Sequence, residues 1–225
     1  TQVHIFGFSL ASLDIRQDSR IHKQVFDEIF SHPKIRDYVE GIPENFNQLD
    51  AKSRHQVLTS VNGDVPVDIF ESTITKETLG SIRAMRKIQE SNGERGCNRY
   101  IISNCQTIDN LLELFALHKI CDWDRPSVDI IPLFETIPDL EVCEEIMNSL
   151  YNNKEYRKHL NTRGDKQTVM LGFSDGTKDG GYFMANWSIY KAKEDLTGLS
   201  KKYGINIAFF DGRGCLLYTS PSPRD

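Results

Sequence analysis

Acidic side chains stand just behind two apolar runs of this sequence. Glu135 follows the run from Val128 to Phe134, and Asp175 lies two residues past the run from Thr168 to Phe173. In α/β barrels and open parallel sheets the carboxyl ends of the strands face one common mouth, so groups behind different strands meet there. Two carboxylates can hold a hard divalent cation that keeps several waters or substrate oxygens. The pattern therefore predicts a Mg²⁺ site.

Cationic side chains follow the same kind of run. Arg16 comes after the run from Val3 to Leu10, Arg213 comes after the run from Ile205 to Phe210, and Lys178 lies close behind the second acid. The guanidinium fork of arginine matches phosphate oxygens in pairs, and lysine adds a point charge. Beside a divalent cation, these groups predict an anionic substrate and suit a phosphate.

Two further acids, Asp179 and Asp211, are candidates for a supporting role at this mouth. Each signal taken singly has an ordinary alternative, because Glu135 could be a solvated loop acid and Arg16 could pair with a nearby aspartate. The six histidines show no H-E-x-x-H pattern and no triad spacing, so we expect them to be structural. Carboxylates and cations gather behind four of the five proposed strands, and this convergence favours a functional site.

The composition is that of a globular chain. With 225 residues, of which 39% are hydrophobic and 26% charged, the chain can build one core. The formal net charge of -5, with 27 Lys and Arg spread along the sequence, argues against a nucleic-acid surface. No apolar stretch approaches the roughly 20 residues of a membrane span, and the N-terminus lacks a signal-peptide pattern. The five cysteines form no C-x-x-C pair, so we expect buried free thiols and a cytoplasmic protein.

The order of the apolar runs predicts an α/β fold. Five short runs have the length and the β-branched or aromatic content of buried strands, and helical patterns separate the later ones. Strand and helix alternating at this spacing predict parallel β-α-β units. The expected strands are Val3–Leu10, Tyr100–Ser103, Val128–Phe134, Thr168–Phe173 and Ile205–Phe210.

Three amphipathic stripes lie between the later runs. The first follows Thr107 as N-cap, the second begins at Pro138 and Asp139, which suit a first turn, and the third ends at Gly204 as C-cap. We expect the aromatic residues of the third stripe to be core. The stripes comprise Ile108, Leu111, Leu112 and Phe115; Leu140, Cys143, Met147 and Leu150; and Phe183, Trp187, Tyr190, Leu196, Leu199 and Tyr203.

A helical insertion is expected over about residues 19–98, after the first strand. Its two long helical patterns run over about Ser19 to Glu40 and about Lys76 to Ser91. The other end of the chain, Cys215 to Asp225, places Ser and Pro in alternation with no apolar partner. One codon spelling of this tail resembles a sequencing-library transposon end and its read adapter, so we expect a non-native, disordered tail. A natural disordered terminus is the alternative, and the nucleotide record distinguishes the two.

Several stretches together resemble successive motifs of phosphoenolpyruvate carboxylase. The likeness is collinear and covers residues 3–214 apart from the helical insertion. It implies that residues 1–214 are an internal fragment of a longer, mostly helical enzyme and carry part of a β/α (TIM-like) barrel catalytic domain. The matching stretches are GFSLASLDIRQDSRIH (7–22), IISNCQTIDNLLELFALHK (101–119), DIIPLFETIPDLE (129–141), VMLGFSDGTKDGGYFMANWSIYKAKEDL (169–196) and FFDGRG (209–214).

The resemblance implies a lyase that fixes carbon dioxide in an anaplerotic reaction of the tricarboxylic acid cycle. Such enzymes join bicarbonate to phosphoenolpyruvate with Mg²⁺ or Mn²⁺, through carboxyphosphate and a metal-stabilised enolate, and release oxaloacetate and phosphate. The family is typically homotetrameric. By motif match, Glu135 and Asp175 are the metal ligands and Arg16 contacts the substrate phosphate. Arg213 steadies the phosphoryl group, and Lys178 contributes directly to this shell.

Two departures from the family pattern bear on function: Asp211 stands where many members have a histidine near bicarbonate, and the likeness ends after GRG. By motif match, Asp179 supports the shell. The residues alone leave two other functions open. The first is another Mg²⁺-dependent barrel enzyme that acts on enolpyruvate phosphate, of the dikinase or lyase type. The second is a non-catalytic helical module.

The glycine-arginine loop that follows GRG in the family is missing, as are later phosphate-binding arginines. We therefore predict that the 225-residue chain expressed alone is poorly soluble and inactive, because open strand edges and apolar faces would be exposed. Oxaloacetate formation by the purified chain, followed by a coupled malate dehydrogenase assay, would contradict this expectation.

Overall fold

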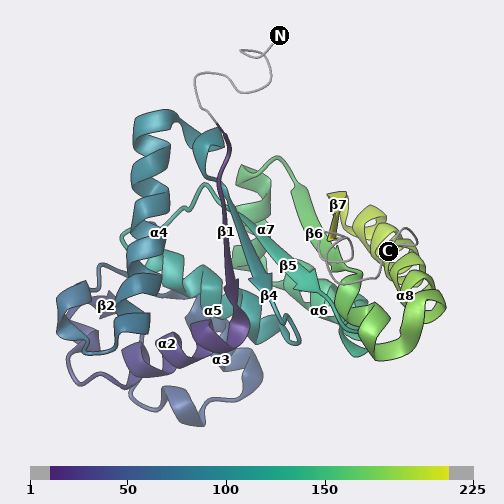
Figure 1. The fold of residues 1–225 in the computed structure, drawn as a ribbon. Coiled ribbons are helices and arrows are strands. Elements are labelled where there is room, and N and C mark those ends of the chain that lie inside the picture. The colour runs from purple at the N-terminus through teal and green to yellow at the C-terminus, as the bar shows by residue number, and fades with distance from the viewer. Residues whose placement is uncertain (1–10, 213–225) are drawn as a thin grey trace.

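The computed structural model of this protein describes residues 11–212 (Figure 1). The expected strand from Val3 to Leu10, the site candidate Arg213 and the tail from Cys215 lie outside the described residues. The rest contains a parallel five-stranded sheet whose strands follow one another in chain order, which confirms the α/β class. The strands of this sheet are β1 (Asp14–Asp18), β4 (Arg99–Ser103), β5 (Asp129–Phe134), β6 (Lys166–Gly172) and β7 (Asn206–Gly212).

Four of the expected strands are confirmed as β4 to β7, with bounds that differ by one or two residues at most ends. The strand β1 was not predicted, because its sequence DIRQD is charged and half exposed at the edge of the sheet. Arg16 therefore lies in the middle of β1, and the run from Val3 to Leu10, behind which it was expected, lies outside the described residues.

Helices connect the strands, and some of their ends lie at the expected signals. Thr136 caps α6 by accepting a hydrogen bond from the Asp139 N–H, and Gly204 ends α8 in the left-handed conformation at φ 66°. The helix α7 was not predicted. It begins anew because the Asn153 side chain accepts two backbone N–H groups of its first turn. The connecting helices are α5 (Ile108–Lys119), α6 (Ile137–Asn152), α7 (Lys154–Thr162) and α8 (Ser174–Tyr203), which is kinked at the non-helical Gly181 (φ 79°).

Between β1 and β4 the chain is mainly helical, as expected. The first predicted helix is too long, since α2 ends at Ser31 and not near Glu40. Pro33 follows His32, and the residue before a proline is pushed out of the helical region. The elements here are α2 (Ser19–Ser31), α3 (Ala51–Ser60), α4 (Thr73–Asn92), the antiparallel pair β2 (Val39–Glu40) and β3 (Asn62–Gly63), and the short 3-10 helices η1 (Ile35–Asp37), η2 (Phe46–Gln48), η3 (Val67–Ile69) and η4 (Glu94–Gly96).

The parallel sheet buries side chains on both of its faces. One face packs under the helices and belongs to the large core, through residues such as Tyr100, Val169 and Leu171. Alternate positions on the other face form a separate small cluster, as expected for a parallel sheet covered on both sides. The members of this small cluster are Ile101, Ile131, Leu133 and Met170.

The aromatic residues at the start of the third stripe are exposed. The side chains of Phe183, Trp187 and Tyr190 on α8 have relative exposures of 82%, 52% and 57%. The expectation that they are core is wrong, although Leu196 and Leu199 further along the stripe are buried. Within residues 11–212, no helix is both long enough and apolar enough to cross a membrane.

Three of the histidines are buried and structural, as predicted. His22 Nε2 lies 2.9 Å from the Tyr100 hydroxyl oxygen, and His118 Nδ1 lies 2.9 Å from the Leu114 carbonyl oxygen. Burial lowers the pKa of His22 and His159 to about 3 and that of His118 to about 4. These imidazoles are therefore neutral in the folded chain near neutral pH.

Acidification should destabilise the fold through these groups. An unfolded histidine titrates near pH 6.5, so the unfolded chain takes up protons first as the pH falls below about 6.5, and stability is lost progressively toward about pH 4. We expect the thermal unfolding midpoint of the full-length protein to fall between pH 7.5 and 5, with a smaller fall in His159→Gln. His32→Gln, outside the core, is the control. Equal pH dependence of His159→Gln and wild type would contradict the assignment.

Candidate active site

Glu135 lies at the junction of two strand ends. It directly follows β5, and its Oε1 accepts a hydrogen bond of 2.8 Å from the backbone N–H of Asn104, which follows β4. Asn104 adopts a left-handed backbone at φ 54°, and its carbonyl oxygen accepts a 2.6 Å hydrogen bond from the Ser19 hydroxyl. The Glu135 side chain is 18% exposed. Its carboxylate is held by the backbone of Asn104, which also binds the first residue of α2.

Arg16 reaches the same carboxylate from the edge of the sheet. Its Nη2 lies 3.8 Å from Glu135 Oε2. In the strand register Arg16 is opposite Ile101, so it belongs to the sheet face that carries the small apolar cluster. The pair is long and the guanidinium is half exposed, so the contact adds little stability and leaves the Arg16 fork available to an anion.

Gly172, the last residue of β6, lets Glu135 pack against its backbone. A Cβ atom added at Gly172 would lie 2.7 Å from Glu135 Cβ and 2.9 Å from Glu135 Cα. Four residues on, a Cβ added at Gly176 would lie 3.6 Å from the Glu135 carbonyl oxygen. The end of β6 and the first turn of α8 therefore run directly past Glu135, and the contact at Gly172 is close enough to require a glycine there.

Asp175 stands in that first turn of α8, where an acid is favoured by the partial positive charge of the helix start. Its Oδ1 accepts a 2.8 Å hydrogen bond from Lys178 Nζ. Both side chains are open to solvent, at 48% and 70% exposure, and Asp179 beside them is exposed as well. Asp175 and Lys178 therefore form an exposed ion pair just behind the end of β6.

Asp211 is not brought together with Glu135. In register it is opposite Leu171, which belongs to the helix-covered core, and its Oδ1 lies 2.7 Å from Lys193 Nζ of α8. Arg213 lies outside the described residues. The structure therefore joins Arg16 with Glu135 and Asp175 with Lys178, and it ties Asp211 to the helix layer.

Two residues at the site were missed by the sequence reasoning. Asn104 could have been found, because it follows a predicted strand as Glu135 does. Arg20 could not have been found, because its place at the site depends on its contact with Asp18. The Arg20 Nη2 donates a 2.7 Å hydrogen bond to the Asp18 carboxylate. This bond lowers the pKa of Asp18 and raises the pKa of Arg20, to which the charge of Glu135 adds. The surroundings of Glu135 thus contain a second guanidinium.

The donor set fits a hard divalent cation that keeps water or substrate ligands. Glu135 Oε1 accepts the hydrogen bond from Asn104, while within residues 11–212 Oε2 has only the long contact to Arg16. Together with the half-exposed Asp175, this offers carboxylate oxygens that suit Mg²⁺ or Mn²⁺. Residues 11–212 contain no group of three or more His, Cys, Asp or Glu placed to hold a metal by themselves. By residue type, Glu135 and Asp175 are the candidates for holding such a cation.

The chain matches one family over most of its length. The family model described as phosphoenolpyruvate carboxylase matches residues 1–217. A protein named phosphoenolpyruvate carboxylase from Nitrosomonas eutropha is 38% identical over 224 residues, which cover 94% of this chain and 23% of that protein. One of the same name from Prochlorococcus marinus is 37% identical over 224 residues, covering 95% and 22%. The chain therefore spans less than a quarter of the length of these relatives.

The close approach at Gly172 can be tested by substitution. In Gly172→Ala of the full-length protein, the new methyl group must displace Glu135, at a cost of about 1–3 kcal/mol of stability. We expect a lower thermal unfolding midpoint and weaker Mn²⁺ binding, measured by electron paramagnetic resonance. Gly198→Ala in α8 is the matched control, because a Cβ there meets no atom within 4 Å and alanine favours a helix. If Gly172→Ala bound Mn²⁺ as wild type does, the packing account would fail.

Proposed function

Since this chain belongs to the phosphoenolpyruvate carboxylase family, we propose that the protein containing it carboxylates phosphoenolpyruvate with bicarbonate to give oxaloacetate and phosphate. The observation that carries the proposal is the placement of Glu135 and Arg16. A carboxylate fixed by a backbone N–H and a guanidinium on the same sheet face stand together at the end of parallel strands. This is the end where α/β enzymes keep their chemistry.

We further propose that the sheet is five strands of a β/α barrel. Its all-parallel strands run in chain order, as barrel strands do, and the edge strands β1 and β7 each have one side open to a further strand. The small cluster of Ile101, Ile131, Leu133 and Met170 lies on the face away from the helices, where a barrel would have its interior. Glu135 and Arg16 would then line the mouth of that interior.

In this proposal Glu135 and Asp175 hold a Mg²⁺ or Mn²⁺ ion, which supplies Lewis-acid stabilisation of negative charge on substrate oxygens. Arg16 binds the phosphate of phosphoenolpyruvate through its fork. Lys178 is held beside the site by Asp175 and adds positive charge for the phosphate. Arg213 is proposed as a second phosphate contact on the basis of its motif.

The proposed reaction has two stages. A bicarbonate oxygen attacks phosphorus and the bond from phosphorus to the enol oxygen breaks, which gives carboxyphosphate and the enolate of pyruvate. Carboxyphosphate then breaks into carbon dioxide and phosphate, and the enolate carbon attacks carbon dioxide to form oxaloacetate. Arg16 and Lys178 would steady phosphoryl oxygens as the phosphorus changes partner, and Asn104 would hold Glu135 in one orientation throughout.

Removing the acids tests the proposed site. In the full-length protein, Glu135→Gln and Asp175→Asn should each lower kcat/KM for phosphoenolpyruvate at least about 100-fold and raise the Mn²⁺ concentration needed for half activity. Both variants keep the size of the side chain and lose its charge. Glu144→Gln on the exposed face of α6 is the control and should match wild type. Unchanged turnover and metal dependence in both site variants would refute the assignment.

The role of Arg16 can be separated from simple charge. Arg16→Lys keeps the positive charge and loses the fork, so we expect a rise in KM for phosphoenolpyruvate of about tenfold or more. KM for bicarbonate should change far less. The measurement is initial-rate kinetics with each substrate varied in turn, and equal effects on both KM values would argue against a phosphate contact.

A further inference from the structure

Three aromatic side chains form an exposed stripe on α8. They follow the kink at Gly181 at steps of four and three residues, which place them on one face of the helix. These residues are Phe183, Trp187 and Tyr190, and each of them is more than half exposed. The rings of Trp187 and Tyr190 stack on each other with their centroids 5.8 Å apart. We call these three residues the outer stripe.

The opposite face of the same helix is buried in the core. Ala185, Ile189 and Ala192 are buried there, and α8 packs against α6 and β7. At about 100° per residue, the outer stripe lies on the other side of the helix from these three residues, so it faces neither the core nor the sheet. From Tyr182 to Tyr190 the helix is therefore apolar on both faces. This pattern is typical of a helix that is covered on both sides.

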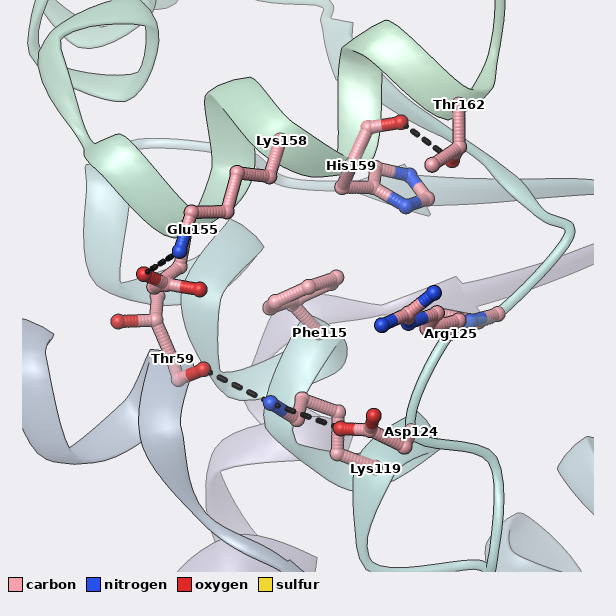
Figure 2. Close-up of a pocket in the computed structure, with 10 residues that line it drawn as sticks. Thr59, Phe115, Lys119, Asp124, Arg125, Glu155, Lys158, His159 and Thr162 are labelled. Carbon is pink, nitrogen blue, oxygen red and sulfur yellow. Dashed lines mark hydrogen bonds and ion pairs between the residues drawn. The ribbon is translucent and has the colours of Figure 1, made fainter.

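Other exposed parts of the helix layer carry charges instead of rings. Figure 2 shows the cavity between α5 and α7, which has charged side chains in its wall. There Lys158 and Glu155, both well exposed, form an ion pair of 2.7 Å. On the outer face of α8, charged side chains appear only beyond Tyr190, beginning at Glu194 one turn later. A group of exposed rings of this kind indicates a surface that another polypeptide segment covers.

The last described residue lies close to the start of the outer stripe. The strand β7 runs parallel to β6 and ends at Gly212, whose carbonyl oxygen accepts a 3.2 Å hydrogen bond from the Phe173 N–H, just before α8. The Phe173 ring in turn contacts the Tyr182 ring edge to face, with a centroid distance of 5.6 Å. Tyr182 directly precedes Phe183. The polypeptide that continues from β7 therefore leaves the sheet at the end where the outer stripe begins.

We propose that the outer stripe is covered by an apolar segment of the same polypeptide that follows residue 214 in the full-length protein. The chain spans less than a quarter of the length of its relatives, so ample polypeptide lies outside it. Because the continuation starts at the same end of the sheet, it reaches the stripe without crossing the molecule. Covering the stripe removes three large rings from water, which stabilises the contact. This inference does not depend on the proposed carboxylation chemistry.

Hydroxyl-radical footprinting of the wild-type full-length protein measures whether the stripe is covered, without any substitution. Trp123 is 9% exposed in the present chain and Trp187 is 52% exposed, and both side chains have the same intrinsic reactivity. If the outer stripe is covered, Trp187 should be oxidised about as slowly as Trp123. A rate for Trp187 several-fold above that of Trp123, in keeping with the two exposures, would overturn the proposal.

Photo-crosslinking then identifies the covering segment. The photoreactive residue p-benzoylphenylalanine replaces Phe183 in the full-length protein, and mass spectrometry locates the attached peptide in oligomers that mix isotopically light and heavy chains. We expect this peptide to come from beyond residue 214 of the same chain. The same substitution at Lys201 is the control, because that residue lies five helical turns further along the same face, in its polar half, and should crosslink far less.

Each other result of the crosslinking would contradict the proposal. A peptide from before residue 1 would assign the stripe to a different part of the polypeptide. A peptide of the other isotopic form would make the stripe an interface between two copies of the protein. Equal crosslinking at Phe183 and Lys201, or none at Phe183, would show that no segment is held specifically on the stripe.

Discussion

The hydrogen bond from the Asn104 N–H to the Glu135 carboxylate is the contact on which the proposed site depends. It joins the ends of β4 and β5, and it requires Asn104 to adopt a left-handed backbone that few residues tolerate. The glycine backbone at 172 closes the third side, since any side chain there would displace Glu135. Three neighbouring strands therefore fix the Glu135 carboxylate, whereas the side chains of Arg16 and Asp175 are about half exposed.

The alternation of side chains along the strands decides which residues can take part. Arg16 and Glu135 lie on the sheet face of the small apolar cluster, so they meet across β4 although their strands are not neighbours. Asp211 has the opposite parity and pairs with Lys193 in the helix layer. The motif FFDGRG thus places its aspartate on the far side of the strand from the proposed substrate. In this chain Asp211 forms an ion pair that holds α8 against β7.

The two ends of the sheet carry different kinds of positive charge. At the carboxyl end the cations are paired with acids that would also hold a metal, so their charge is largely balanced in the folded chain. At the amino end Arg125 has no partner in residues 11–212, and Lys119 is buried in the wall of the cavity between α5 and α7. The helix α5 spans the distance between them with both of its ends fixed, by Thr107 at one end and by the Lys119 to Thr59 contact at the other.

Local patterns in the sequence were sufficient for the strands β4 to β7 and for several helix ends. The strands β4 to β7 are continuous apolar runs, and Thr107, Thr136 and Gly204 mark helix ends through chemistry that involves only neighbouring residues. The sequence also placed Glu135 and Asp175 behind their strands, because chain direction alone puts the carboxyl ends of parallel strands at one edge.

Only the tertiary structure decided the rest. The edge strand β1 exists because β4 pairs with it, Asn104 matters because β5 ends beside it, and the aromatic stripe of α8 is exposed because α6 covers the other side of that helix. Such outcomes depend on contacts between residues far apart in the chain, which no local periodicity encodes.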